Sequence, residues 1–136
     1  AAKAVSKAIP SLEGKLSGSA IRVPVINVSI AVLSLNLKSK ASVEEINQLL
    51  KAASSRAELT GQIGYSDCAD AVSSDFIGSH QAGILDSLST KVRENQAILY
   101  VWYDNEYGYS CQVVRLMEKL AQVSTEKAKL LEDQAA

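Results

Sequence analysis

The run A-I-L-Y-V-W-Y, from Ala97 to Tyr103, constrains the fold more than any other stretch of the chain. A strand with one face in water alternates apolar and polar residues, whereas this run places apolar or aromatic side chains on both faces. We therefore expect a central strand and the best-buried one of its sheet. Its end overlaps the stretch W-Y-D-N-E-Y-G-Y-S, residues 102–110, in which acids, an amide and a glycine stand beside four aromatic rings.

Four further strands are predicted from runs of β-branched and aliphatic residues, at 19–23, 27–37, 62–65 and 83–87. Pro24 separates the first two, because proline cannot sit in the middle of a central strand. Within 27–37 the apolar alternation changes phase after Val32, which implies a bulge or burial on both faces. A polar loop is expected at 66–81.

Two helices are predicted from capping and periodicity. Ser42 and Glu45 form a capping box, and apolar residues recur at helical spacing through 43–54. Past Gly108 a second stripe of apolar residues recurs at helical spacing: Val113, Leu116, Met117, Leu120 and Val123. Residues 125–136 either extend that helix or fray. Because only one full helix separates the strands, we expect the α+β class, with a mainly antiparallel mixed sheet covered by helices.

Composition excludes several classes of function. The 136 residues carry a formal charge of -1, so we expect no binding of nucleic acid, and no apolar run reaches the roughly 20 residues of a membrane span. Two cysteines are too few for a zinc site and suit a reducing cytoplasm, so we expect a soluble cytoplasmic protein without a metal. The N-terminal A-A-K-A-V-S-K-A-I favours a helix but has no capping residue, which suggests a chain cut within a helix.

A search for self-sufficient catalytic machinery finds none. No G-x-G-x-x-G or P-loop is present, and G-Q-I-G-Y at 61–65 lacks the third glycine and the following helix. His80, the only histidine, is interpreted as a surface-loop residue. Cys111 is expected to be a small buried hydrophobe and Cys68 lies in an acidic loop, so neither is typical of an activated thiol.

Two features leave alternatives open. Arg22 stands among apolar residues, where its cation either meets a carboxylate or lies on an exposed strand face, or else binds an anion such as phosphate. In the 102–110 stretch, Asp104 or Asn105 caps the last helix and Gly108 relieves a tight corner, or the same polar groups hold a ligand over the aromatic rings.

Four blocks of sequence resemble the C-terminal part of the phosphorylating glyceraldehyde-3-phosphate dehydrogenases. They are A-A-K-A-V-S-K-A-I-P, A-I-R-V-P-V-I-N-V-S, V-S-S-D-F-I-G and W-Y-D-N-E-Y-G-Y-S, in the family's order, extending to about residue 123. The resemblance implies that 1–123 is a partial catalytic domain and 124–136 a polar tail. It also implies that the Rossmann domain, the catalytic cysteine and the catalytic histidine lie upstream, so no catalytic residue is expected within the fragment and the isolated chain should be inactive.

The resemblance also assigns roles to three residues. Arg22 matches the arginine of the R-V-P motif, which binds the phosphate groups of the triose phosphate and of inorganic phosphate. Asn105 matches the asparagine that holds the nicotinamide carboxamide of NAD or NADP, and Tyr109 matches the aromatic residue beside the nicotinamide ring. The resemblance also implies a glycolytic enzyme that is a tetramer at full length.

Three departures from the family pattern stand beside these matches. Val25 replaces a frequent threonine after R-V-P, Ala82-Gly83 replaces a serine pair, and the tail beyond Val123 is longer than usual. Two alternatives remain: a fragment of the related erythrose-4-phosphate dehydrogenase, and a non-catalytic module that uses the sheet face for oligomerisation.

Overall fold

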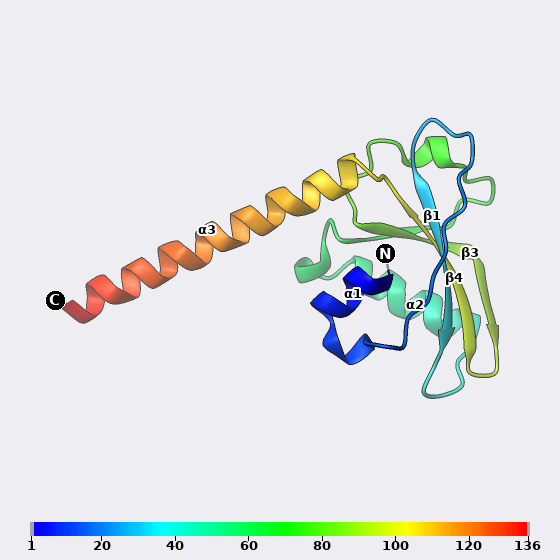
Figure 1. Ribbon diagram of the computed structural model, residues 1–136, viewed down its shortest axis with the longest axis horizontal. Helices are drawn as coiled ribbons and strands as arrows, with labels where there is room; N and C mark the ends of the chain where they lie inside the picture. The colour runs from blue at the N-terminus through cyan, green and yellow to red at the C-terminus, as the bar shows by residue number, and fades with distance from the viewer. Residues whose placement is uncertain (1, 136) are drawn as a thin grey trace.

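The computed structural model describes residues 2–135, with side chains from residue 4 to residue 123. A four-stranded sheet forms the body of the molecule, and the long helix α3 projects away from it (Figure 1). The strands are β1 (Ser29–Asn36), β2 (Ile63–Ser66), β3 (Gly83–Arg93) and β4 (Gln96–Tyr103). They lie in the order β1-β4-β3-β2. The β1/β4 and β3/β4 pairs are antiparallel and β2/β3 is parallel, which confirms the predicted α+β class and mixed sheet.

The central position predicted for 97–103 is confirmed, because β4 pairs with β1 on one side and β3 on the other. The prediction that it is the best-buried strand is wrong. Only Ala97 and Leu99 are buried in β4, whereas β3 buries the four consecutive residues 84–87 and also Thr90. β3 is covered because α2 packs on it, with Asn47 bonded to Ser87 O and to the Thr90 hydroxyl, and because Phe76 is buried against Ile84.

The strand predicted at 19–23 is wrong. Residues 16–26 run as an irregular segment whose only described backbone hydrogen bond is Val25 N to Val23 O, at 3.0 Å. Ile21 and Ile26 are 87% and 96% exposed. Extended propensity alone makes no strand, since a strand needs a neighbour to accept and donate its ladder hydrogen bonds.

The phase change in 27–37 reflects neither a bulge nor burial on both faces. β1 pairs with β4 in unbroken register from Ser29↔Tyr103 to Asn36↔Gln96, and as an edge strand it leaves Ile30, Val32 and Leu33 exposed. The register shift lies instead in β3, between Asp86 and Lys91.

The helix predicted at 43–54 is confirmed as α2 (Val43–Ser54). Its capping box is complete, because Ser42 Oγ accepts from Glu45 N and a Glu45 carboxylate oxygen accepts from Ser42 N. α2 packs on β2 and β3, and Lys51 Nζ lies 5.1 Å from the centre of the Tyr65 ring. The other helices are α1 (Ala2–Ala8) and three short 3-10 turns, at Pro10–Leu12, Ala57–Leu59 and Ser73–Phe76.

The last helix is α3 (Tyr107–Ala135). Of the two alternatives for residues 125–136, its backbone shows extension of the helix as far as Ala135. The apolar stripe that begins at Val113 is present but not covered, with Leu116, Met117 and Leu120 about 60% exposed. The side chains of 124–136 lie outside the described ones. Among residues 2–135, no helix is both long and apolar enough to cross a membrane.

A small apolar core supports the junction between β4 and α3. Val28, Phe76 and Ile84 are buried together, with Trp102 packed against them. The Phe76 and Trp102 rings stack with centres 5.2 Å apart, and Trp102 Nε1 donates to an Asp86 carboxylate oxygen at 3.3 Å. This cluster anchors the end of β4, immediately before the residues that lead into α3.

Candidate functional site at the β4–α3 junction

Asp104 organises the junction. Its Oδ1 accepts hydrogen bonds from the backbone N–H groups of Glu106 and Tyr107, at 3.0 and 2.9 Å, which is the geometry of a helix cap. Asp104 is therefore the capping residue of α3, and Asn105 is not. Asp104 is 3% exposed as a residue, so these bonds also satisfy a buried charge.

The same carboxylate ties two distant segments to the helix start. Oδ2 accepts from Gly78 N at 2.9 Å, and Oδ1 accepts from Asn27 Nδ2 at 3.1 Å. The hydrogen bonds from Gly78 and Tyr107, with those from Glu106 and Asn27, lower the pKa of Asp104 against the opposing effect of burial. Asp104 thus stays ionised and holds three parts of the chain together.

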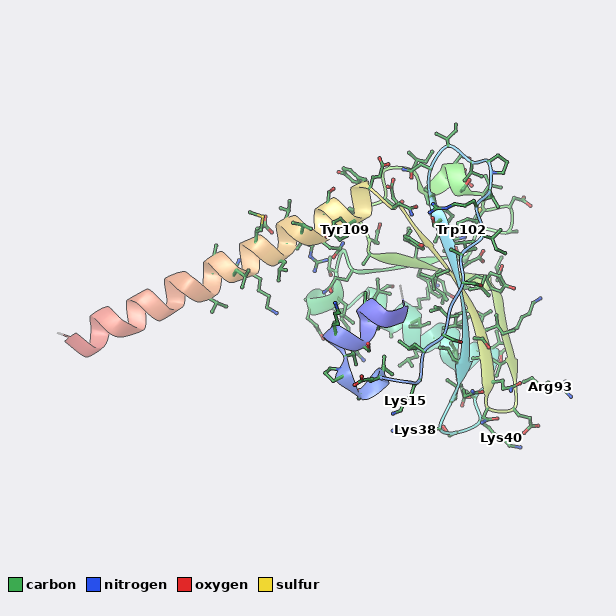
Figure 2. All side chains as sticks on the ribbon, viewed as in Figure 1. Lys15, Lys38, Lys40, Arg93, Trp102 and Tyr109 are labelled. Atoms are coloured by element: carbon green, nitrogen blue, oxygen red, sulfur yellow. The ribbon has the colours of Figure 1, made fainter. Side chains whose placement is uncertain are left out.

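A shallow depression of about 220 Å³ opens beside this cap. Asn105 and Tyr109 both line it, and Tyr109 stands at the end of α3 nearest the sheet (Figure 2). The remaining lining residues are Ala82, Tyr103, Asp104 and Gln112. The depression therefore offers an amide, which both donates and accepts, beside aromatic rings that can flank a planar group.

Gln112 and Gly108 hold α3 against the neighbouring loops. Gln112 is not among the residues singled out from the sequence, and Gly108 has a role other than the expected one. Gln112 Nε2 donates to Gly61 O at 3.0 Å and to His80 O at 2.9 Å. Gly108 is buried, and a Cβ there would lie 2.8 Å from Gln81 O. Gly108 thus permits a close helix-to-loop contact, which corrects the expectation that it relieves a tight corner.

A second depression, of about 440 Å³, lies along another face of α3. It is lined by His80, Tyr107, Ser110, Cys111, Val114, Arg115 and Glu118. His80 is exposed in a loop, as predicted, while Cys111 is partly rather than fully buried. Sequence gave no reason to expect these two residues in one depression. Among the described residues, no group of three or more potential ligands could hold a metal ion.

Arg22 is not brought to either depression. It lies in the irregular segment 16–26 and is exposed. Because this segment is not a strand, the expected alternative of an exposed strand face is wrong. Within residues 4–123 the two salt bridges are Lys40 with Glu94 and Lys51 with Asp67, so the alternative of an ion pair is not supported either. The guanidinium is accessible to an anion.

Comparison with protein-family models matches residues 1–105 to the family described as glyceraldehyde 3-phosphate dehydrogenase, C-terminal domain. A glyceraldehyde-3-phosphate dehydrogenase-like protein of Pseudomonas aeruginosa is 51% identical over 124 residues, which cover 91% of this chain and 27% of that protein. The glyceraldehyde-3-phosphate dehydrogenase of Borreliella burgdorferi is 48% identical over 122 residues, 88% of this chain and 36% of that enzyme.

Glyceraldehyde-3-phosphate dehydrogenase 3 of Saccharomyces cerevisiae is 44% identical over 122 residues, 89% of this chain and 36% of that enzyme. The chain thus spans between 27% and 36% of the length of these relatives. The resemblance carried by the four sequence blocks is confirmed, and so is the expected fold class. The chain belongs to the glyceraldehyde 3-phosphate dehydrogenase family, and its residues 1–105 match that family's C-terminal domain.

Proposed function

We propose that this chain is a segment of an NAD-dependent phosphorylating glyceraldehyde-3-phosphate dehydrogenase, with 1–123 in the catalytic domain and 124–136 as a tail. The complete enzyme would oxidise glyceraldehyde 3-phosphate with NAD and phosphate to 1,3-bisphosphoglycerate and NADH. The nicotinamide cofactor, NAD or NADP, supplies the hydride acceptor when bound. The catalytic cysteine and histidine belong to other parts of the enzyme, and this chain contributes binding groups.

The observation that carries the proposal is that Asn105 and Tyr109 line one depression. A carboxamide presents one acceptor and two donors, and the Asn105 side chain offers the complementary set. The exposed ring of Tyr109 would flank the flat face of the nicotinamide. At about 220 Å³ the depression is smaller than the roughly 300 Å³ at which ligand sites usually begin, so it suits one ring of a dinucleotide rather than the whole.

Arg22 would bind phosphate, either of the substrate or of the attacking inorganic phosphate. Its support is the R-V-P motif together with the exposed guanidinium, which meets no carboxylate within the described residues. An arginine fork can donate two parallel hydrogen bonds to phosphate oxygens. Arg22 and the Asn105 depression are separate binding elements in this chain, each requiring groups from elsewhere in the enzyme.

One face of the sheet supports a homo-oligomer, a tetramer in the full-length enzyme. Ile30 and Val32 in β1 share a face with Tyr100 and Trp102 of β4 by register, and the first two are 39% and 56% exposed. Exposed apolar surface of this kind favours subunit contacts. Sedimentation of this chain checks the point, since a strictly monomeric chain would argue against a self-associating face. A cytoplasmic location belongs to the same proposal; one relative, from Magnolia liliiflora, is named as cytosolic.

The test of the proposed site is kinetic and uses the complete dehydrogenase. Asn105→Ala should raise KM for NAD about tenfold, because one good hydrogen bond to the cofactor is lost. Asn36→Ala, an exposed asparagine at the far end of β1, is the matched control and should leave KM unchanged. An unchanged KM in Asn105→Ala would contradict the assignment. The 136-residue chain alone should show no turnover with glyceraldehyde 3-phosphate, NAD and phosphate, and measured turnover would reject the fragment interpretation.

A further inference from the structure

The side chains that line the junction depression have no hydrogen bonds of their own to fix them. None of the hydrogen bonds of residues 4–123 involves the Asn105 amide or the Tyr109 hydroxyl, and Tyr109 is 70% exposed. The position of Tyr109 therefore depends on where the first turn of α3 lies, and that of Asn105 on the turn that leads into the helix. Whatever fixes the helix against the body of the molecule also fixes the depression.

The cap at Asp104 fixes only the start of the helix. A helix held at one end can still tilt, and Tyr109 lies five residues beyond the cap. Tyr109 and Gln112 stand three residues apart in α3 and so share a helix face, whereas Asn105 lies in the turn that leads into the helix. Gln112 thus continues the face that carries Tyr109, one turn further from the sheet, and it also lines the depression.

Gln112 makes the second attachment. Its amide nitrogen bonds two carbonyl oxygens from separate loops, Gly61 O at 3.0 Å and His80 O at 2.9 Å. Those loops are themselves held together, because Ala82 N and Gly83 N both donate to Gln62 O. Gly108 allows the intervening turn to lie against the Gln81 carbonyl. The helix is therefore held at both ends of the segment that carries the depression.

We propose that Gln112 is a positioning residue for nicotinamide binding: its two hydrogen bonds set the orientation of α3 and thereby the placement of the Tyr109 ring relative to Asn105. This rests on the proposed function of the junction. Gln112 also receives a hydrogen bond from Arg115 NH1 at 3.4 Å, but on its oxygen, so both amide hydrogens remain directed to the loops.

The test uses the complete dehydrogenase and three variants. Gln112→Met keeps the length of the side chain but removes its donors. It should weaken the binding of NAD, measured directly by titration calorimetry, about five- to tenfold and raise KM for NAD equally, while kcat and KM for the aldehyde stay within twofold. Gln112→Lys restores donors to the same carbonyls and should return KM for NAD to within about threefold of the parent. Gln48→Met makes the same chemical change at an exposed position of α2 and should have no effect.

The outcomes separate this inference from the proposed function. If Asn105→Ala raises KM for NAD but Gln112→Met does not, Gln112 has no positioning role and the proposed function stands. If neither variant changes it, the nicotinamide assignment itself fails. A loss in Gln112→Met that affects all kinetic constants alike, and that Gln112→Lys does not restore, indicates only a structural contact and overturns the inference.

Discussion

Two regions of this chain carry family motifs, and the chain fixes them very differently. At the β4–α3 junction, Asp104 is 3% exposed and accepts four hydrogen bonds, from three separate segments. In the R-V-P segment, residues 16–26 contain one described backbone hydrogen bond, and Ile26 is 96% exposed. The junction is determined by contacts within this chain, whereas the R-V-P segment is exposed and makes few contacts within it.

The residue that follows the R-V-P segment is tied to the junction, because the Asn27 amide donates to Asp104. The difference between them teaches that a conspicuous motif and a fixed geometry are separate properties. A motif becomes a fixed site only where enough of its polar groups are satisfied locally. Substitutions in the two regions should therefore have very different effects on stability.

The largest effect is expected from Asp104→Ala, which removes the acceptor of all four hydrogen bonds at the junction. The variant should lower the Tm of the chain by roughly 5–10 °C, measured by circular dichroism. Asp104→Asn keeps one side-chain oxygen able to cap the helix and should lose less than half as much. A Tm unchanged in Asp104→Ala would show that the junction is held by other contacts.

The next largest change in stability is expected from Gly108→Ala, and whether the variant is more or less stable than the parent is informative. Helix propensity alone predicts that alanine stabilises by about 1 kcal/mol. The new Cβ, however, would lie 2.8 Å from Gln81 O, a backbone atom, so we expect destabilisation by roughly 1–2 kcal/mol in urea unfolding. Gly18→Ala is the control, because its Cβ would meet nothing within 4 Å. Stabilisation by Gly108→Ala would mean that α3 does not pack closely on the loop.

Acid should weaken the junction through Asp104. Its pKa lies below the ordinary value of 3.8, because Gly78 N–H and the other donors favour the ionised form. The folded chain then binds fewer protons than the unfolded chain, so this stabilisation is complete above about pH 5 and is lost as pH falls through the folded pKa. The stability difference between the parent and Asp104→Asn, measured by urea unfolding, should shrink from pH 5 to pH 3. A difference that does not change with pH would contradict this coupling.

The smallest effect on stability is expected in the R-V-P segment. Arg22→Ala should change the free energy of unfolding by less than about 0.5 kcal/mol, because the side chain is exposed and makes no ion pair within the described residues. In the complete dehydrogenase the same variant should raise KM for the phosphorylated substrate about tenfold or more. A large loss of stability in Arg22→Ala would erase the contrast between the two regions.

Much of the fold could be predicted because its signals are local. The capping box of Ser42 and Glu45 and the periodicity after it predicted α2 with its correct bounds, since a helix closes its hydrogen bonds within one segment. The apolar run at 97–103 predicted the central strand, since side chains on both faces need cover. The failures concern pairing: the 19–23 segment has strand-like residues but no neighbouring strand, and the register shift falls in β3 rather than β1.

The candidate site divides in the same way. The sequence by itself determined the family, the class of fold and the residues of interest, Arg22, Asn105 and Tyr109, because these follow from the identity and order of motif residues. Only the tertiary structure decided that Asn105 and Tyr109 share a depression while Arg22 lies elsewhere. It also decided that Gln112, Gly78 and Asn27 donate hydrogen bonds at this junction. Their partners are 51, 26 and 77 residues away along the chain, and a hydrogen bond across such a separation depends on how the sheet brings loops together, which no local pattern encodes.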